Sequence, residues 1–237
     1  MITAENGKKN IFVSAIIAAA GSSTRMGGGD KQSLELFGKT VLERSIEAFE
    51  NSGIIDEIIV SAREDAVEDI KALVKAKGFT KVRAVCAGGA TRQQSVKNAV
   101  ACCSENTDFV AIHDGARPLV TGDIIRKTVQ AAIRYGAASC AVRVKDTIKV
   151  ASDDCSVLST PDRSALWAVQ TPQVFDFKQY VLLLKNVSAD ITDDCQVFEA
   201  AGQTVMLVEG DYENIKITTP EDIILANAIL KARENNA

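Results

Sequence analysis

Short apolar runs alternate with amphipathic stretches from Ile11 to Gly136. The first run, 11–17 (IFVSAII), is rich in Ile and Val and is typical of a strand buried on both faces of a parallel sheet. The same pattern predicts further strands at 58–60, 82–86 and 109–112, and helices at about 41–49, 66–76, 91–103 and 121–135. Strands separated by helices of this length indicate βαβ units. We therefore predict a Rossmann-like α/β fold, with a mostly parallel sheet flanked by helices.

The alternation breaks after Ala138. Apolar residues alternate with Arg and Lys over 142–150, and Asp153-Asp154 mark a turn, which predicts an inserted β-hairpin arm at about 139–165. A lone hairpin is marginally stable in water, so the arm must pack on its own domain or, as we favour, on a second subunit. Helices near 177–185 and 193–201, a strand at 205–208 and a helix opening at Thr219 complete a single domain over 1–237.

Composition restricts the classes of partner. The net charge of −4 argues against non-specific nucleic-acid binding, which needs a basic face. No apolar stretch approaches the roughly 20 residues of a membrane span, and 1–10 lacks the apolar block of a secretion signal. The six cysteines form no C-x-x-C pair and His113 is the single histidine, so we expect reduced thiols, no zinc site and a cytoplasmic protein.

A loop of small residues after the first strand carries the strongest chemical signal. Residues 18–31 read AAAGSSTRMGGGDK, in which glycines let backbone N–H groups approach a ligand while Arg25 and Lys31 supply positive charge. This combination suits a polyanion such as a triphosphate. The later GKT at 38–40 is not a P-loop, because Ser33 stands where that motif needs glycine. No dinucleotide fingerprint and no G-x-S-x-G elbow is present either.

Four segments of unusual composition follow predicted strands: 18–31, 87–95, 113–118 and, less clearly, 144–147. Ligands bind beyond the carboxyl ends of the strands in open parallel sheets, so we expect these segments to share one crevice. Asp114 is a carboxylate at such an end and suits Mg²⁺, which takes few protein ligands together with phosphate oxygens. His113 beside it is predicted to be a hydrogen-bonded residue of the strand end rather than an acid or base.

Seven ordered blocks carry a resemblance to a known family. They are AAAGSSTRM with Lys31, GGATRQQSV, HDGARP, KDTIK, QTPQVF, TDD and NIKITTPED. Together they resemble the 2-C-methyl-D-erythritol 4-phosphate cytidylyltransferases, from about Ile11 to Ala228. The resemblance implies transfer of CMP from CTP to methylerythritol phosphate with release of pyrophosphate, in the non-mevalonate route to isoprenoid precursors, with a divalent cation such as Mg²⁺. Because the attack brings two anions together, catalysis would consist mostly of charge neutralisation and alignment.

The resemblance also assigns roles to individual positions. Arg25 and Lys31 would stabilise the transition state, and Arg163 and Lys216 would position the sugar phosphate. Nucleotide contacts would come from Ala18, Ala19, Ala20, Gly21, Gly88, Gly89, Ser95 and Asp114, with Asp114 also the metal ligand. Acceptor contacts would come from Gly115, Arg117, Thr147 and Thr192. Lys216 stands between Ile215 and Ile217, which predicts buried strand neighbours and a lysine that points into the crevice.

Some alternatives stay open on the sequence. In the family the arm reaches across a homodimer, so Thr147 and Arg163 would serve the partner's site. The nearest competing activity is ribitol 5-phosphate cytidylyltransferase: Ala116 and the Ala-Ala-Ala-Gly start favour methylerythritol phosphate, while Cys195 after TDD leans the other way. A sugar-1-phosphate nucleotidyltransferase is more distant. A non-catalytic nucleotide-binding domain is disfavoured, because the expected cations are all present.

Overall fold

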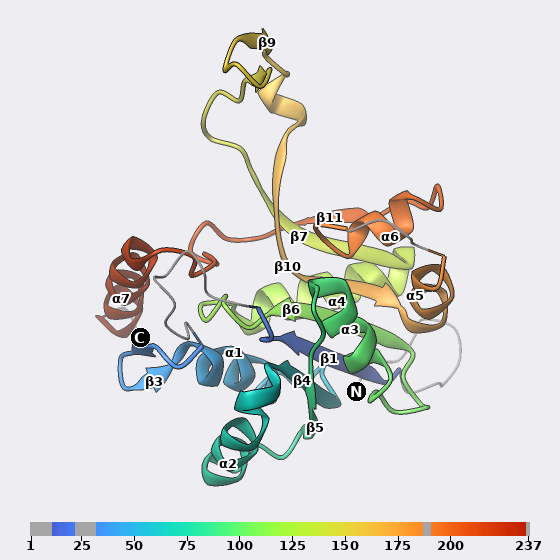
Figure 1. Ribbon diagram of the computed structural model, residues 1–237, viewed down its shortest axis with the longest axis vertical. Helices are drawn as coiled ribbons and strands as arrows, with labels where there is room; N and C mark the ends of the chain where they lie inside the picture. The colour runs from blue at the N-terminus through green and yellow to red at the C-terminus, as the bar shows by residue number, and fades with distance from the viewer. Residues whose placement is uncertain (1–10, 22–31, 187–190, 236–237) are drawn as a thin grey trace.

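A seven-stranded sheet forms the centre of the molecule (Figure 1), a computed structural model that describes residues 11–21, 32–186 and 191–235. Its strands are β1 (Val13–Ala18), β4 (Glu57–Ala62), β5 (Val82–Ala87), β6 (Phe109–Asp114), β7 (Ala137–Arg143), β10 (Trp167–Asp176) and β11 (Met206–Glu209). They lie in the order β11-β7-β10-β6-β1-β4-β5. Every neighbouring pair is parallel except the two that involve β10, which confirms the predicted α/β fold with a mostly parallel sheet.

Helices cover both faces of this sheet. They are α1 (Val41–Glu50), α2 (Val67–Lys77), α3 (Arg92–Val100), α4 (Gly122–Tyr135), α5 (Phe177–Leu184), α6 (Cys195–Glu199) and α7 (Pro220–Asn235). Successive side chains of a strand point to opposite faces. Ile17 of β1 accordingly packs in a core with α1, α2 and α4, while its neighbour Ile16 packs in a core with α3, α5 and α6. The central strands are thus buried on both sides, as their unbroken apolar runs predicted.

Local capping explains where several helices begin and end. Thr121 accepts a hydrogen bond from the backbone N–H of Ile124 at the start of α4, and Gly136 follows the end of that helix. Thr91 caps α3 in the same way. Such caps satisfy N–H groups that the first turn leaves without a partner. The helices predicted at 91–103 and 193–201 are shorter in the structure, as the bounds of α3 and α6 show.

One strand was missed by the sequence analysis. The ten-residue β10 runs antiparallel between β6 and β7, and its register shifts between Val169 and Gln173. Pro172 lies inside this irregular stretch and cannot donate a ladder hydrogen bond, which fits its place at a shift in register. A strand whose apolar pattern is interrupted by QTPQ has no clear period of two, so it could not be recognised from local pattern alone.

The arm comprises residues 144–166 and stands away from the body of the molecule (Figure 1). It carries the antiparallel pair β8 (Val150–Ala151) and β9 (Val157–Ser159), followed by the 3₁₀ helix η3 (Arg163–Ala165). The predicted start at 139 was too early, because β7 belongs to the central sheet. Val157 and Leu158 are 61% and 66% exposed, so the apolar side chains at the tip are not covered by this chain.

The segment before α7 brings distant residues to the end of β6. The backbone N–H of Ile217 donates to the carbonyl of Ala116 (2.8 Å), and Ile217 is buried in a small core with α7 and the short strands β2 (Glu35–Leu36) and β3 (Lys39–Thr40) nearby. Residues 214–217 are not a strand, so that expectation for the neighbours of Lys216 was wrong, and Ile215 is only half-buried. The remaining element is the 3₁₀ helix η2 (Glu64–Ala66). Across the described residues, no helix has both the length and the apolar character that crossing a membrane requires.

Candidate active site

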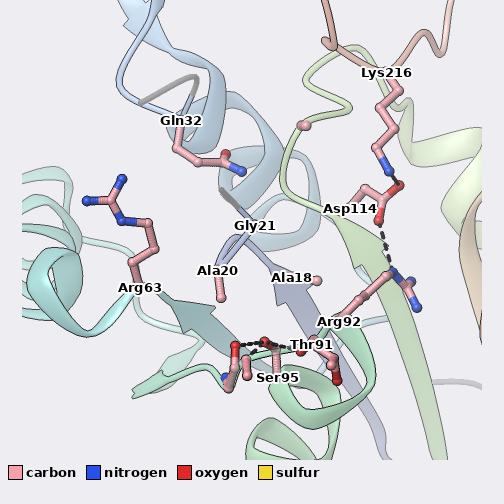
Figure 2. Close-up of a pocket in the computed structure, with 13 residues that line it drawn as sticks. Ala18, Ala20, Gly21, Gln32, Arg63, Thr91, Arg92, Ser95, Asp114 and Lys216 are labelled. Atoms are coloured by element: carbon pink, nitrogen blue, oxygen red, sulfur yellow. Dashed lines mark hydrogen bonds and ion pairs between the residues drawn. The ribbon is translucent and has the colours of Figure 1, made fainter. Parts of the chain in front are cut away.

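A cavity of about 460 Å³ lies at the carboxyl ends of β1, β4, β5 and β6 (Figure 2). Its lining residues are Ala18, Ala20, Gly21, Gln32, Arg63, Gly89, Ala90, Thr91, Arg92, Ser95, Asp114, Ala116 and Lys216. Three of the four segments predicted to converge therefore do so. The fourth, 144–147, leads into the arm and does not line this cavity. In a parallel sheet this edge is the usual place for a ligand.

Asp114 is the charged centre of the cavity, and three cations surround it. Its Oδ2 lies 2.8 Å from Nζ of Lys216 and 3.6 Å from Nε of Arg117, and its Oδ1 lies 3.7 Å from Nε of Arg92. Burial alone would raise the pKa of Asp114, but the charges of Lys216 and Arg92, and then of Arg117, outweigh it and hold that pKa well below its usual range. Asp114 is therefore a carboxylate, and the cluster carries a net positive charge that suits an anionic ligand.

Lys216 is held in place while its ammonium group stays accessible. An ammonium group has three N–H donors, and the ion pair with one carboxylate oxygen of Asp114 does not occupy all of them. The Lys216 side chain is 37% exposed and lines the cavity, as predicted. Arg117 supports this arrangement, because its Nη1 donates to the carbonyl of Asn214 (2.8 Å) and ties the Lys216 segment to β6. The Arg117 contacts in the structure are to protein groups, and its predicted contact with the acceptor stays a prediction.

The second glycine loop has no room for side chains. A Cβ on Gly88 would lie 2.3 Å from Cβ of Ala20 and 2.8 Å from Oγ of Ser95, so the loops after β1 and β5 touch at this point. Ser95 organises the loop, since its hydroxyl accepts from the N–H of Gly89 (3.0 Å) and donates to the carbonyl of Thr91 (2.9 Å). The close approach leaves backbone groups and small side chains to face a ligand.

His113 is buried beside the site and holds the strand end together. The carbonyl of Arg117 only accepts, so Nε2 of His113 carries the proton that is donated to it (3.2 Å). Nδ1 then accepts from the Thr171 hydroxyl (3.0 Å), whose oxygen in turn accepts the backbone N–H of Asp114 (3.0 Å). Burial lowers the pKa of His113 to about 4, so the ring is neutral near pH 7. The interpretation of His113 as a hydrogen-bonded strand-end residue is confirmed.

Arg92 and Asp194 are site residues that the sequence analysis missed. Nη1 of Arg92 lies 2.6 Å from Oδ2 of Asp194, whose other oxygen accepts from the Tyr180 hydroxyl (2.6 Å). Burial lowers the pKa of Arg92, but the charges of Asp194 and Asp114 more than compensate and raise it. A signal was available, because a positive residue in the first turn of a helix opposes the helix dipole and calls for an anionic partner.

Not every predicted site residue can be placed at the cavity. Arg25 and Lys31 fall outside the described residues. Thr147 and Arg163 are exposed on the arm, where Arg163 Nη1 donates to the carbonyl of Lys145 (2.6 Å), and neither lines the cavity. Thr192 is exposed and exchanges hydrogen bonds with Gln196. Ala19, Gly88 and Gly115 lie next to lining residues but do not line the cavity themselves.

Asp114 fits the chemistry of a magnesium ligand, although it stands alone. It is the one acid among the described residues that line the cavity, and no cluster of three acidic, histidine or cysteine ligands occurs in the described part of the chain. Its Oδ1 has a cation at 3.7 Å but no hydrogen bond from a described residue, so one oxygen remains available. Mg²⁺ commonly takes one or two carboxylates and completes its shell with phosphate oxygens and water.

Small-residue loops beside a basic cavity, at the carboxyl edge of a mostly parallel sheet, define an α/β enzyme that binds a nucleotide. The sequence profile of the family described as 2-C-methyl-D-erythritol 4-phosphate cytidylyltransferase matches residues 13–232. The chain belongs to this family, and it is a cytidylyltransferase, one of the nucleotidyltransferases.

Individual relatives agree with this assignment. The 2-C-methyl-D-erythritol 4-phosphate cytidylyltransferase of Alkaliphilus oremlandii is 44% identical over 228 residues, covering 93% of this chain and 95% of that protein. The enzyme of the same name from Caldanaerobacter subterraneus subsp. tengcongensis is 46% identical over 224 residues, covering 92% and 99%. The crystal structure of 4-diphosphocytidyl-2C-methyl-D-erythritol synthase from Anaerococcus prevotii superposes with a TM-score of 0.82 at 35% identity, covering 93% of this chain and 99% of that one.

Proposed function

We propose that this chain transfers CMP from CTP to 2-C-methyl-D-erythritol 4-phosphate, giving 4-diphosphocytidyl-2-C-methyl-D-erythritol and pyrophosphate. The observation that carries the proposal is the cavity itself, in which Lys216 and Arg92 flank Asp114 opposite the small-residue loops. The family relationship favours this acceptor over ribitol 5-phosphate.

The reaction follows from the placement of charge. A phosphate oxygen of the acceptor attacks the α-phosphorus of CTP in line with the departing pyrophosphate, so the bond to the acceptor forms as the bond to the β-phosphate breaks. Attack of one anion on another needs cations close to both reactants. Lys216 faces the cavity and directs the acceptor phosphate, while Asp114 fixes the ammonium group. Arg25 and Lys31 neutralise the triphosphate as pyrophosphate leaves.

The nucleotide is held by the two small-residue loops. Ala18, Ala20 and Gly21 approach the phosphates and ribose, and the loop at Gly88-Gly89, shaped by Ser95, receives the base. The close contact between these loops leaves a narrow slot that suits a pyrimidine better than a purine. Asp114 binds the ribose or a divalent cation. Such a cation, Mg²⁺ in the first instance, neutralises phosphate charge when bound.

We also propose that the protein is a homodimer. The arm carries exposed apolar side chains at its tip, and Thr147 and Arg163 lie on it outside the cavity of their own chain. We infer that the arm packs on a second subunit and brings both residues to the partner's acceptor site. The protein acts in the cytoplasm on small anionic substrates and binds neither nucleic acid nor membrane.

One comparison tests the reaction. Pyrophosphate release is measured with CTP and Mg²⁺ in the presence of methylerythritol phosphate or ribitol 5-phosphate, and the cytidylylated product is identified by mass spectrometry. We expect turnover with methylerythritol phosphate, little with ribitol 5-phosphate, and loss of turnover after chelation of divalent cations. Preferential turnover of ribitol 5-phosphate would show that the acceptor is wrong.

A further inference from the structure

The Arg92 guanidinium lies between two carboxylates at unequal distances. It is 2.6 Å from Oδ2 of Asp194 and 3.7 Å from Oδ1 of Asp114. Both contacts are ion pairs, and the pair with Asp194 is the shorter. Arg92 comes from the first turn of α3, next to the nucleotide loop, whereas Asp194 comes from the segment that leads from Thr192 into α6. Figure 2 shows Arg92 reaching from α3 toward Asp114.

Asp194 is held rigidly in this position. It is fully buried, its Oδ1 accepts the Tyr180 hydroxyl at 2.6 Å, and its backbone N–H donates to Oε1 of Gln173 at 2.9 Å. Tyr180 is itself fully buried in the core beneath β10. A buried carboxylate with these fixed contacts needs a cation beside it, because an uncompensated buried charge is costly. Arg92 supplies that cation.

The position of Arg92 between the two carboxylates affects how accessible Asp114 is to a ligand. Lys216 and Arg117 lie nearest to Oδ2 of Asp114, and among the described residues no group donates a hydrogen bond to Oδ1. If Arg92 were released from Asp194, the nearest anionic oxygen would be Oδ1, and the guanidinium would close that oxygen off. Asp194 thus holds Arg92 at ion-pair distance from Oδ1, too far to donate a hydrogen bond to the oxygen that a ligand needs.

We propose that Asp194 is a positioning residue for nucleotide binding, which acts by withholding the Arg92 guanidinium from Asp114. Asp194 does not touch the nucleotide. Its effect passes through Arg92 to Asp114, whose Oδ1 stays open to a ribose hydroxyl or a divalent cation. The inference deepens the proposed function, on which it rests for the identity of the nucleotide.

A set of three variants tests this role: Asp194→Asn, Arg92→Gln and the two combined. The dissociation constant of CTP with Mg²⁺ is measured by calorimetry without acceptor, and KM and kcat follow from pyrophosphate release. We expect Asp194→Asn to weaken CTP binding about tenfold, within the range of coupling between contacting charges, and to raise KM for CTP more than it lowers kcat. Arg92→Gln leaves the buried Asp194 carboxylate without its cation and removes one positive charge from the cavity, so it should lower the melting temperature and weaken CTP binding less than Asp194→Asn does.

The double variant gives the decisive result. Once residue 92 is neutral, nothing competes for Asp114, so the combined variant binds CTP better than Asp194→Asn alone. A purely structural role predicts the opposite, because the second substitution would add to the damage. A double variant no better than Asp194→Asn overturns the proposal, as does a loss of CTP binding in Arg92→Gln as large as that in Asp194→Asn, since the guanidinium would then bind the nucleotide itself.

Controls separate folding and chemistry from positioning. Glu43→Gln removes another buried carboxylate from an ion pair, with Lys77 at 2.8 Å, on helices that do not line the cavity, and should leave CTP binding unchanged. If Asp194→Asn does not fold alone, the double variant is compared with Arg92→Gln. Because Asp194 acts only through Arg92, the two should bind CTP alike, and weaker binding by the double variant overturns the proposal. A wild-type protein that binds CTP without turning over methylerythritol phosphate would reject the proposed reaction, while the order of CTP affinities would still test Asp194. A wild-type protein that does not bind CTP overturns both.

Discussion

Nζ of Lys216 lies 2.8 Å from Oδ2 of Asp114. The two residues are far apart in the sequence: Lys216 lies in the loop before the last helix, α7, and Asp114 ends the central strand β6. The pair joins the cation that we propose faces the acceptor to the acid that we propose faces the nucleotide. Its closeness depends on the backbone hydrogen bond from Ile217 to Ala116.

Removal of the Lys216 charge should impair catalysis far more than folding. We expect Lys216→Ala to lower kcat by about 10²–10³-fold, as for other groups that stabilise developing charge. The pKa of Asp114 should rise toward its usual range, because Lys216 is the foremost of the cations that lower it. Pyrophosphate release measures the first effect. Lys127→Ala is the matched control, since it removes an exposed ion pair with Asp123 on α4, and an equal loss of activity there would contradict the assigned role.

Gly88 should not tolerate a side chain. Gly88→Ala places a methyl group 2.3 Å from Cβ of Ala20 and forces the two nucleotide loops apart, at a stability cost of about 1–3 kcal/mol. We expect KM for CTP to rise at least about tenfold, since displaced loops lose contacts worth about 1.4 kcal/mol or more. The control is Gly53→Ala, whose added Cβ meets nothing within 4 Å. Equal KM values in the two variants would show that the close approach is unimportant.

His113 should make stability depend on pH. Burial lowers its pKa from 6.5 to about 4, so the unfolded chain binds more protons than the folded chain between these values. The stabilisation by neutral His113 is complete above about pH 6.5 and is lost as the pH falls through 4, by about 3–4 kcal/mol in total at about 1.4 kcal/mol per pKa unit.

Urea unfolding of the wild type and His113→Gln at pH 7.5 and pH 4.5 measures this effect. The variant cannot titrate at position 113, so its loss of stability between the two pH values should be smaller by about 2–3 kcal/mol. Carboxyl groups titrate in both proteins and cancel in the difference. Parallel pH dependences would mean that the imidazole is not held neutral in the folded state.

If the arm serves the partner's site, two inactive variants should restore activity when they are mixed. Arg163→Ala and Lys216→Ala should each abolish most activity. If Arg163 serves the partner's site, a heterodimer of the two variants has one site with both defects and one intact site. An equal mixture should therefore recover about a quarter of wild-type activity when subunits pair at random.

A disrupted interface provides the control for this experiment. Leu158 is 66% exposed at the arm tip, and Leu158→Asp should prevent dimerisation, as measured by light scattering, and remove the complementation. Recovery of activity in a monomeric mixture, or none in a dimeric one, would rule out exchange of the arm between sites.

Much of the architecture could be predicted because it depends on the local sequence pattern. The unbroken apolar run of β1, the Thr121 cap of α4 and the left-handed Gly78 after α2 each act over a few residues, and the strand and both helices lie where expected. The site loops could be placed at one edge because parallel strands end on the same side. By contrast, β10 carries an irregular stretch around Pro172, so its local pattern did not reveal a strand inserted antiparallel between β6 and β7.

The sequence by itself determined the order of elements from Ile11 to Gly136, the α/β class, the glycine loops and the acid at the end of β6, since backbone conformation and burial pattern are short-range properties. Only the tertiary structure decided which charges meet: that Lys216 pairs with Asp114, and that Arg92 pairs with both Asp194 and Asp114 and lies closer to Asp194. Such pairings depend on strand register, on the path of the segment before α7 and on the burial of Tyr180 and Asp194. Those are distances between parts of the chain that no local pattern relates.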